Sequence, residues 1–168
     1  LLATAQGAGT TTVFDLNYRS KLWPPAEARK TYESLFERID ILVAAERDVD
    51  IVLDRQGPAE ELAESLAADF SFETVIITRG ADGALAVHEG STYEQPAFKA
   101  DTVDAIGTGD AFAGGYLARY VAGDTVSEAL SYAAATAALK RTIEGDLAVV
   151  TPKEVEGVLD SEGRGISR

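Results

Sequence analysis

Short apolar runs alternate along this chain with longer stretches in which apolar residues recur with the spacing of a helix face. The first pattern is typical of strands and the second of amphipathic helices. Strands are predicted at 10–16, 39–44 and 74–78, and helices at 24–39, 47–53, 57–70, 109–122, 127–141 and 151–159. Because strands that alternate with helices form a parallel sheet with helices on both faces, the pattern predicts an α/β fold.

A β-hairpin is predicted between the last of these strands and the next helix. Residues 83–88 and 91–96 read as strands, and Glu89-Gly90 separates them with a dipeptide that suits a tight turn. His88 ends the first of these strands and is expected to lie on the surface. Further along, Thr151 precedes a proline and is predicted to cap the last helix.

Composition limits the kinds of chemistry. The chain has 168 residues, no cysteine and a single histidine, which argues against disulfides, a zinc site and a serine–histidine triad. Acidic residues outnumber basic ones 28 to 15, giving a net charge of −13. This charge argues against nucleic-acid binding and favours a salt-rich cytoplasm. No apolar run is long enough to cross a membrane.

A glycine-rich segment at 104–112 carries the clearest chemistry. It reads Asp-Ala-Ile-Gly-Thr-Gly-Asp-Ala-Phe and leads directly into a predicted helix. The amides of Gly107, Thr108 and Gly109 can point at an anion, and the helix start adds partial positive charge. Asp110 can then take a proton from a hydroxyl group. Phosphoryl transfer to an alcohol needs this combination, although a plain capped helix start is the alternative.

The same segment resembles the second signature of the ribokinase-like (PfkB) carbohydrate kinases, Asp-Thr-X-Gly-Ala-Gly-Asp-X-Phe. The resemblance implies that the amides of residues 107–109 form an anion hole and that Asp110 is the catalytic base. Ala105 and Thr108 depart from the pattern, but neither change removes an amide or the carboxylate. Asp104 matches an acid that binds a monovalent cation, potassium (K⁺), in some relatives.

A second segment, at 14–23, follows the first predicted strand, where α/β proteins collect ligands. Taken alone, Asp15 and Asn17 read as turn residues and Arg19 as a surface residue. The segment resembles the Asp-X-Asn-X-Arg-X-X-Leu-Trp of 2-keto-3-deoxygluconate kinases. This implies that Arg19 contacts the acidic sugar, which suits its planar guanidinium group, and that Asn17 faces the phosphates. Trp23 is expected to pack under the loop.

The nucleotide loop is implied at 78–83, which is similar to the family's Lys-X-Gly-X-X-Gly. The resemblance assigns Thr78, Gly80 and Gly83 to nucleotide binding, whereas the bare motif is only a turn. Residues 133–135 match the region that lines the adenine pocket in relatives, but the usual asparagine is absent, so only an apolar wall is implied.

A magnesium contact is implied at Asp48. Related kinases carry Asn-X-X-Glu here, and the acid helps to hold Mg²⁺ through water. This chain has Ala45 in place of the asparagine and Asp48 in place of the glutamate. A charge on a helix surface is the alternative for Asp48.

The resemblance runs from about residue 14 to residue 159 in family order. It implies the carboxyl-terminal part of a ribokinase-like, three-layer α/β/α kinase with a mostly parallel sheet, spanning 1–160, without the β-sheet lid and with a flexible tail at 161–168. The implied reaction is phosphorylation of the terminal hydroxyl of 2-keto-3-deoxygluconate by ATP with Mg²⁺, in the cytoplasm. Without the lid, we expect the chain alone to be inactive.

Other functions stay open at this point. Within the family, a fructokinase or a ribokinase is the alternative, and a nucleotide-binding module without activity is another. A dinucleotide-binding oxidoreductase is disfavoured because the glycines come late in the chain. The expected partners are a sugar acid and ATP, with no nucleic acid and no membrane, and homo-oligomers stay open for a longer parent protein.

Overall fold

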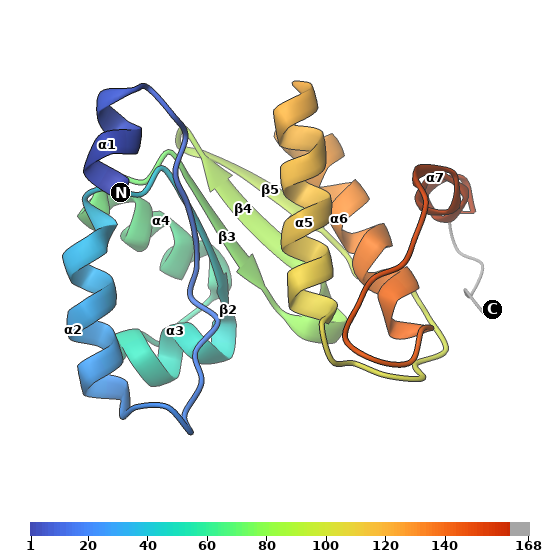
Figure 1. Cartoon of the computed structure of the whole chain (residues 1–168), viewed down its shortest axis with the longest axis horizontal. Coiled ribbons are helices and arrows are strands. Elements are labelled where there is room, and N and C mark those ends of the chain that lie inside the picture. Colours follow the sequence, from blue (N-terminus) through green and yellow to red (C-terminus); the bar gives the residue numbers. More distant parts are fainter. Residues whose placement is uncertain (162–168) are drawn as a thin grey trace. The chain divides into compact units, whose positions relative to one another are not determined.

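The computed structural model describes residues 1–161 (Figure 1). The chain folds into two compact units. The first unit comprises Leu1–Arg79 and Leu85–Tyr93. The second comprises Gly80–Ala84 and the described residues from Glu94 onward. The tail predicted at 161–168 lies outside the described residues except for Ser161.

Every helix and strand predicted from the sequence has a counterpart; β3 has the predicted bounds, and the ends of the other elements differ from the prediction by up to a few residues. Within residues 1–161, no helix combines the length and the apolar character that a bilayer crossing requires. The elements are α1 (Leu2–Gly7), β1 (Val13–Asp15), α2 (Pro25–Phe36), β2 (Ile41–Ala45), α3 (Glu46–Leu53), α4 (Ala59–Phe70), β3 (Thr74–Thr78), the 3₁₀ turn η1 (Gly80–Asp82), β4 (Ala84–His88), β5 (Ser91–Gln95), α5 (Thr108–Ala122), α6 (Val126–Arg141) and α7 (Pro152–Asp160).

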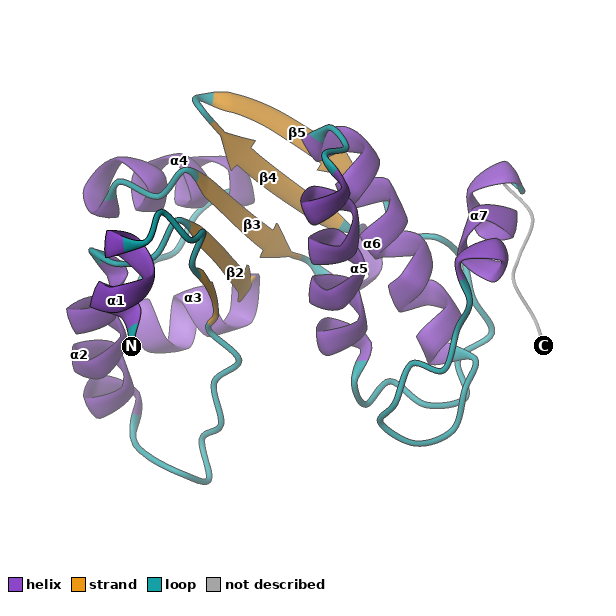
Figure 2. Ribbon diagram, turned by 45° about the horizontal axis from the view of Figure 1, so that its top comes forward, coloured by secondary structure: helices purple, strands orange, loops and turns teal. Residues whose placement is uncertain are grey.

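The strands form one sheet in the order β1-β2-β3-β4-β5. β1, β2 and β3 are parallel, with Val13 opposite Ile41 and Ile41 opposite Thr74. Figure 2 shows that β4 runs against β3 and that β5 returns beside β4. The predicted hairpin turn has positive φ angles at Glu89 (48°) and Gly90 (75°), as a tight two-residue turn requires. The sheet is therefore mixed, and the α/β prediction is confirmed.

Aromatic side chains centre the core of the first unit. Phe36 on α2 is fully buried, and its ring meets Phe70 and Phe72 edge-on at centroid distances of 4.8 and 5.2 Å. Such pairs each add about 0.5–1.5 kcal/mol beyond the burial of their area. Trp23 packs against the same core and meets the ring of Tyr32 at 5.4 Å, so it lies under its loop as predicted.

Close helix packing forms the second unit, in which α5 and α6 lie side by side (Figure 1). A Cβ on Gly115 of α5 would lie 2.8 Å from Thr136 Oγ1 and 3.1 Å from Ala133 Cα on α6. The alanine-rich face of α6 thus packs closely against α5. The helix α7 also packs on α6: Val155 and Val158 of α7 are buried against Ala135 and Leu139 of α6.

Capping boxes begin α6 and α7. The Thr151 hydroxyl accepts the Glu154 amide, and the Glu154 carboxylate accepts the Thr151 amide, which confirms the predicted cap. Thr125 and Glu128 make the same pair at α6, slightly before the start predicted at 127. Each cap contributes about 1 kcal/mol.

The amino-terminal region differs from the prediction. The helix α1 was not predicted, because its short segment lacks a side-chain cap and buries no residue. The strand predicted at 10–16 covers only Val13–Asp15. Just before it, the Thr12 amide donates to the Asp40 carboxylate at 2.6 Å.

Candidate active site

The glycine-rich turn leads directly into α5, as the sequence predicts. Gly107 is the N-cap, with φ 77° and ψ 3°, and no side chain caps this helix. The first backbone bond of the helix runs from the Ala111 amide to the Gly107 carbonyl at 2.9 Å. Asp110 lies in the first turn and is exposed. The amino-terminal amides of α5 and one carboxylate therefore occupy the same helix end.

Gly107 is required here for two physical reasons. Its φ is positive, and a Cβ would lie 2.1 Å from the carbonyl oxygen of Asp146. The turn before α5 is thus pressed against the loop that follows α6. Any side chain at residue 107 would separate the two segments.

Thr108 stabilises the turn through its own side chain. Its hydroxyl donates to the Ala105 carbonyl at 2.7 Å, and its amide donates to the same oxygen at 3.3 Å. The threonine that departs from the family pattern therefore adds a hydrogen bond within the turn.

Asp104 ties the same two loops together. Its carboxylate accepts the Ile106 amide at 2.9 Å and the Gly145 amide at 3.1 Å. The bond from Ile106, then that from Gly145 and the charge of Lys140, hold the pKa of Asp104 below its ordinary value of 3.8. Asp104 is consequently ionised at neutral pH, and both of its oxygens are engaged.

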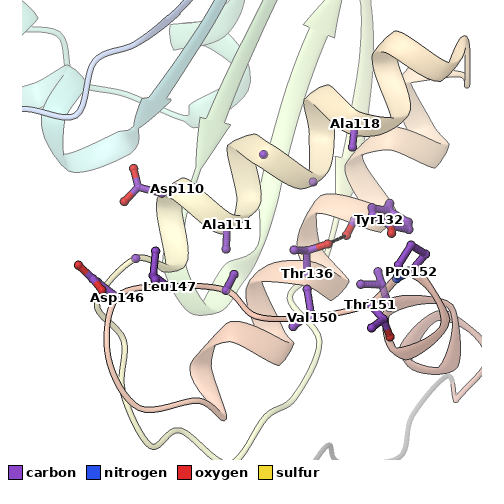
Figure 3. Close-up of a pocket in the computed structure, with 15 residues that line it drawn as sticks. Asp110, Ala111, Ala118, Tyr132, Thr136, Asp146, Leu147, Val150, Thr151 and Pro152 are labelled. Atoms are coloured by element: carbon purple, nitrogen blue, oxygen red, sulfur yellow. Dashed lines mark hydrogen bonds between the residues drawn. The ribbon is translucent and has the colours of Figure 1, made fainter.

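A pocket of about 390 Å³ opens beside this turn. Figure 3 shows Asp110 and Asp146 at one end, and Tyr132, Thr151 and Pro152 at the other. On the α5 side, the pocket is lined by residues with small or no side chains, which leaves room for a ligand (Ala111, Gly114, Gly115 and Ala118). The pocket thus joins a mostly apolar space to the uncapped start of α5, which suits a ligand with a flat apolar part and an anionic part.

The residues at 133–135, which the resemblance assigns to the wall of an adenine pocket, do not line this pocket. On α6, Tyr132 and Thr136 line the pocket, whereas the residues predicted at 133–135 are buried in helix packing. The loop that supplies Leu147 and Val150 was not predicted. Leu147 and Val149 in this loop are 71% and 72% exposed, which only the structure shows.

The predicted nucleotide loop forms the 3₁₀ turn η1 after β3. A Cβ on Gly83, at φ 93°, would lie 2.0 Å from the carbonyl oxygen of Gln95, so glycine is required by close packing. Gly80, at φ 60°, has open space around it. Thr78 ends β3 in the first unit. Nucleotide contact by these three residues stays a prediction.

The predicted substrate loop of the first unit is closed by its own hydrogen bonds. The Tyr18 hydroxyl donates to the Trp23 carbonyl at 2.8 Å. Asn17 has a φ of 36° and is exposed. Arg19 is exposed, and its Nη1 donates to the Asn17 and Tyr18 carbonyls at 3.3 and 3.4 Å. These long bonds leave the guanidinium group accessible to a ligand.

Asp48 anchors this loop from the start of α3. It is 3% exposed, and its carboxylate accepts the Tyr18 amide at 3.3 Å and pairs with Arg47 at 3.1 Å. Asp48 also lines a pocket of about 410 Å³ with Ser20 and Ile51. The buried Asp48 therefore holds the loop through the Tyr18 amide. Its contact with magnesium stays a prediction.

The predicted residues therefore gather in two groups. The second unit brings Asp104, Gly107, Thr108, Gly109 and Asp110 to one loop junction. The first unit brings the loop that carries Asn17 and Arg19 against Asp48.

Comparison with known proteins identifies the family. Residues 1–153 match the pfkB family of carbohydrate kinases. The chain belongs to this family. It is 65% identical over all of its 168 residues to 2-dehydro-3-deoxygalactonokinase from Haloferax volcanii, of which it covers 53%. The chain thus spans about half the length of this relative.

Solved structures of two sugar or sugar-acid kinases share the fold. A 2-dehydro-3-deoxygluconokinase from Thermotoga maritima superposes with a TM-score of 0.83 at 30% identity, over 95% of this chain and 53% of that one. A fructokinase double mutant from Vibrio cholerae O395, in a form with bound fructose, ADP and potassium ion, gives 0.84 at 29% identity, over 94% and 53%. The ribokinase-like fold predicted from the sequence is confirmed.

Proposed function

We propose that this chain is the carboxyl-terminal, nucleotide-binding part of a kinase that phosphorylates the terminal hydroxyl of 2-keto-3-deoxygluconate or of its galactonate epimer. The observation that carries the proposal is the pocket that joins apolar walls to the start of α5 beside Asp110. The names of the Haloferax and Thermotoga relatives support this class of sugar acid. The activity is proposed for the protein at the full length of these relatives.

The nucleotide is proposed to lie along the pocket. Its base occupies the end near Tyr132 and Pro152, and its terminal phosphates face the amides of residues 107–109. These amides stabilise the charge on the transferred phosphoryl group, because they are fixed in place before the reaction. Thr78, Gly80 and Gly83 are proposed to contact the nucleotide as well.

Asp110 is proposed to act as the general base. It accepts the proton of the terminal hydroxyl as that oxygen attacks the γ-phosphorus atom, and ADP leaves. Arg19 is proposed to bind the carboxylate of the sugar acid through its planar guanidinium group, and Asn17 faces the phosphates.

Magnesium is proposed to arrive with ATP. Within residues 1–161, no three acidic or histidine side chains gather as a metal site. Mg²⁺ would therefore be held mainly by phosphates and water, with Asp48 as the contact proposed from the first unit. When bound, Mg²⁺ neutralises charge on the nucleotide phosphates.

The test is a substrate comparison on the full-length protein with Mg-ATP in concentrated KCl. We expect kcat/KM to be highest for the two sugar acids and far lower for fructose and ribose. A preference for a neutral sugar would favour the fructokinase or ribokinase alternative. The 168-residue chain alone is expected to bind ATP without turnover, and turnover by it would contradict the proposed need for the remaining half.

Arg19→Ala tests the choice of substrate. Loss of a charge-assisted hydrogen bond to a carboxylate costs about 1.5–3 kcal/mol, so kcat/KM for sugar acids should fall roughly 10- to 100-fold. Activity on neutral sugars should not change. Arg29→Ala is the matched control, because Arg29 makes only a surface pair with Glu33 on α2. An equal loss for acidic and neutral sugars would overturn the role of Arg19.

A further inference from the structure

Lys140, in the last turn of α6, is fully buried. The other four lysines of the chain are exposed (Lys21, Lys30, Lys99 and Lys153). Removing an ammonium group from water is costly unless polar partners replace the water. The buried ammonium group of Lys140 must therefore have polar partners inside the protein.

The partners of Lys140 are backbone oxygens from the two loops beside the candidate site. Its Nζ donates to the Ile143 carbonyl at 3.1 Å and to the Asp104 carbonyl at 3.3 Å. Its charge also helps to keep the Asp104 carboxyl ionised. Carbonyl oxygens beside a carboxylate are the surroundings that a bound alkali or alkaline-earth cation takes in proteins. Here a covalently attached ammonium group occupies them.

This junction continues into the anion hole. The Val103 and Asp104 amides donate to the Arg141 carbonyl at 2.8 and 3.1 Å, and the Asp104 carboxylate accepts the Gly145 amide. Three residues later, Gly107 packs directly on the Asp146 carbonyl. Lys140 therefore helps to fix the position of the Gly107 turn, because it binds a carbonyl in each of the two loops that meet there.

We infer that the ammonium group of Lys140 acts as a built-in cation, which holds the 104–109 turn in its anion-binding form so that phosphoryl transfer does not depend on K⁺. Lys140 is thus a positioning residue, and it replaces the monovalent cation that the sequence led us to expect at Asp104. The fructokinase with bound potassium ion provides the contrast within the family. This inference rests on the proposed kinase function.

The first test needs no variant. The full-length protein is assayed in KCl, NaCl and tetramethylammonium chloride at one high ionic strength, so that general salt effects stay constant. We expect the same kcat in all three salts. A wild-type protein that is active in KCl and inactive in tetramethylammonium chloride would overturn the inference while leaving the kinase function intact. A protein that phosphorylates no sugar in any salt would overturn the kinase function instead.

The second test removes the ammonium group. Lys140→Met keeps the length of the side chain but leaves the carbonyls unpaired, and a misplaced turn costs about 100-fold in kcat. Activity should return with K⁺ or ammonium ions and not with tetramethylammonium. Lys140→Gln, which keeps a donor without the charge, serves if the methionine variant does not fold. Lys30→Met, on the exposed face of α2, is the matched control.

Thermal unfolding gives a readout that does not need turnover. The melting temperature of the Lys140 variants should rise in K⁺ relative to tetramethylammonium at equal ionic strength, and that of the wild type should not. If the activity and the melting temperature of the Lys140 variants are the same with every cation, the inference is overturned.

Discussion

A Cβ on Gly107 would lie 2.1 Å from the carbonyl oxygen of Asp146. This contact joins the start of α5 to the loop after α6, and the φ of Gly107 is positive as well. Gly107→Ala should therefore destabilise the protein by about 2 kcal/mol or more, since the clash adds to the cost of a left-handed residue. Denaturant unfolding measures the change.

Gly109→Ala is the matched comparison for that variant. Gly109 lies within α5, and a Cβ there meets nothing within 4 Å. Alanine should raise helix stability by up to about 1 kcal/mol, yet its methyl group would face an anion bound at the helix start. We expect preserved stability with weaker ATP binding. Equal stability losses for the two alanine variants would show that the Asp146 contact is not the cause.

The acid side of the stability profile should depend on Asp104. Its pKa is lowered in the folded protein by the Ile106 and Gly145 amides and by Lys140, so the folded state binds this proton less readily than the unfolded state. The resulting stabilisation is present above the unfolded pKa of 3.8 and is lost as the pH falls through the folded pKa. Asp104→Asn should thus lower the melting temperature at neutral pH, and the difference should shrink towards pH 3. A difference that does not vary with pH would contradict this explanation.

Some parts of the site were readable in the sequence for a physical reason. Gly107 and Gly83 occupy left-handed positions pressed against backbone carbonyls, and only glycine fits there. Thr151 and Glu154 have the spacing of a capping box, which depends on local geometry alone. Such features leave a direct trace in the sequence.

Other parts depend on distant contacts and left no such trace. Lys140 looks like any lysine near a helix end, and only the folded chain places it under the Asp104 carbonyl. Leu147 and Val150 line the pocket from a loop without regular structure. The same limit applies to Thr12, because its bond to Asp40 links residues 28 positions apart.

Stability should also depend on salt concentration. The chain carries a net charge of −13, and acidic residues on the exposed face of α4 contribute to it. Repulsion among these charges grows when screening weakens, since the Debye length rises to about 10 Å at 0.1 M salt. The melting temperature should fall on dialysis from molar KCl into dilute buffer. Replacing Glu60, Glu61 and Glu64 by glutamine should reduce this salt dependence, and an unchanged dependence would point away from charge repulsion.

Asp110 offers the most direct test of the chemistry. Asp110→Asn keeps the size of the side chain but removes the carboxylate that we propose as the proton acceptor, so kcat should fall by about 100- to 10,000-fold. Asp110 lies in the first turn of α5, where a negative charge is favourable, and its loss should cost only about 0.3–1 kcal/mol of stability. Nucleotide binding should be retained, because the amides at the helix start are unaltered. Asp160→Asn, at the exposed end of α7, is the control and should leave kcat unchanged. If Asp110→Asn keeps the wild-type kcat in a steady-state assay with saturating Mg-ATP, another group must accept the proton.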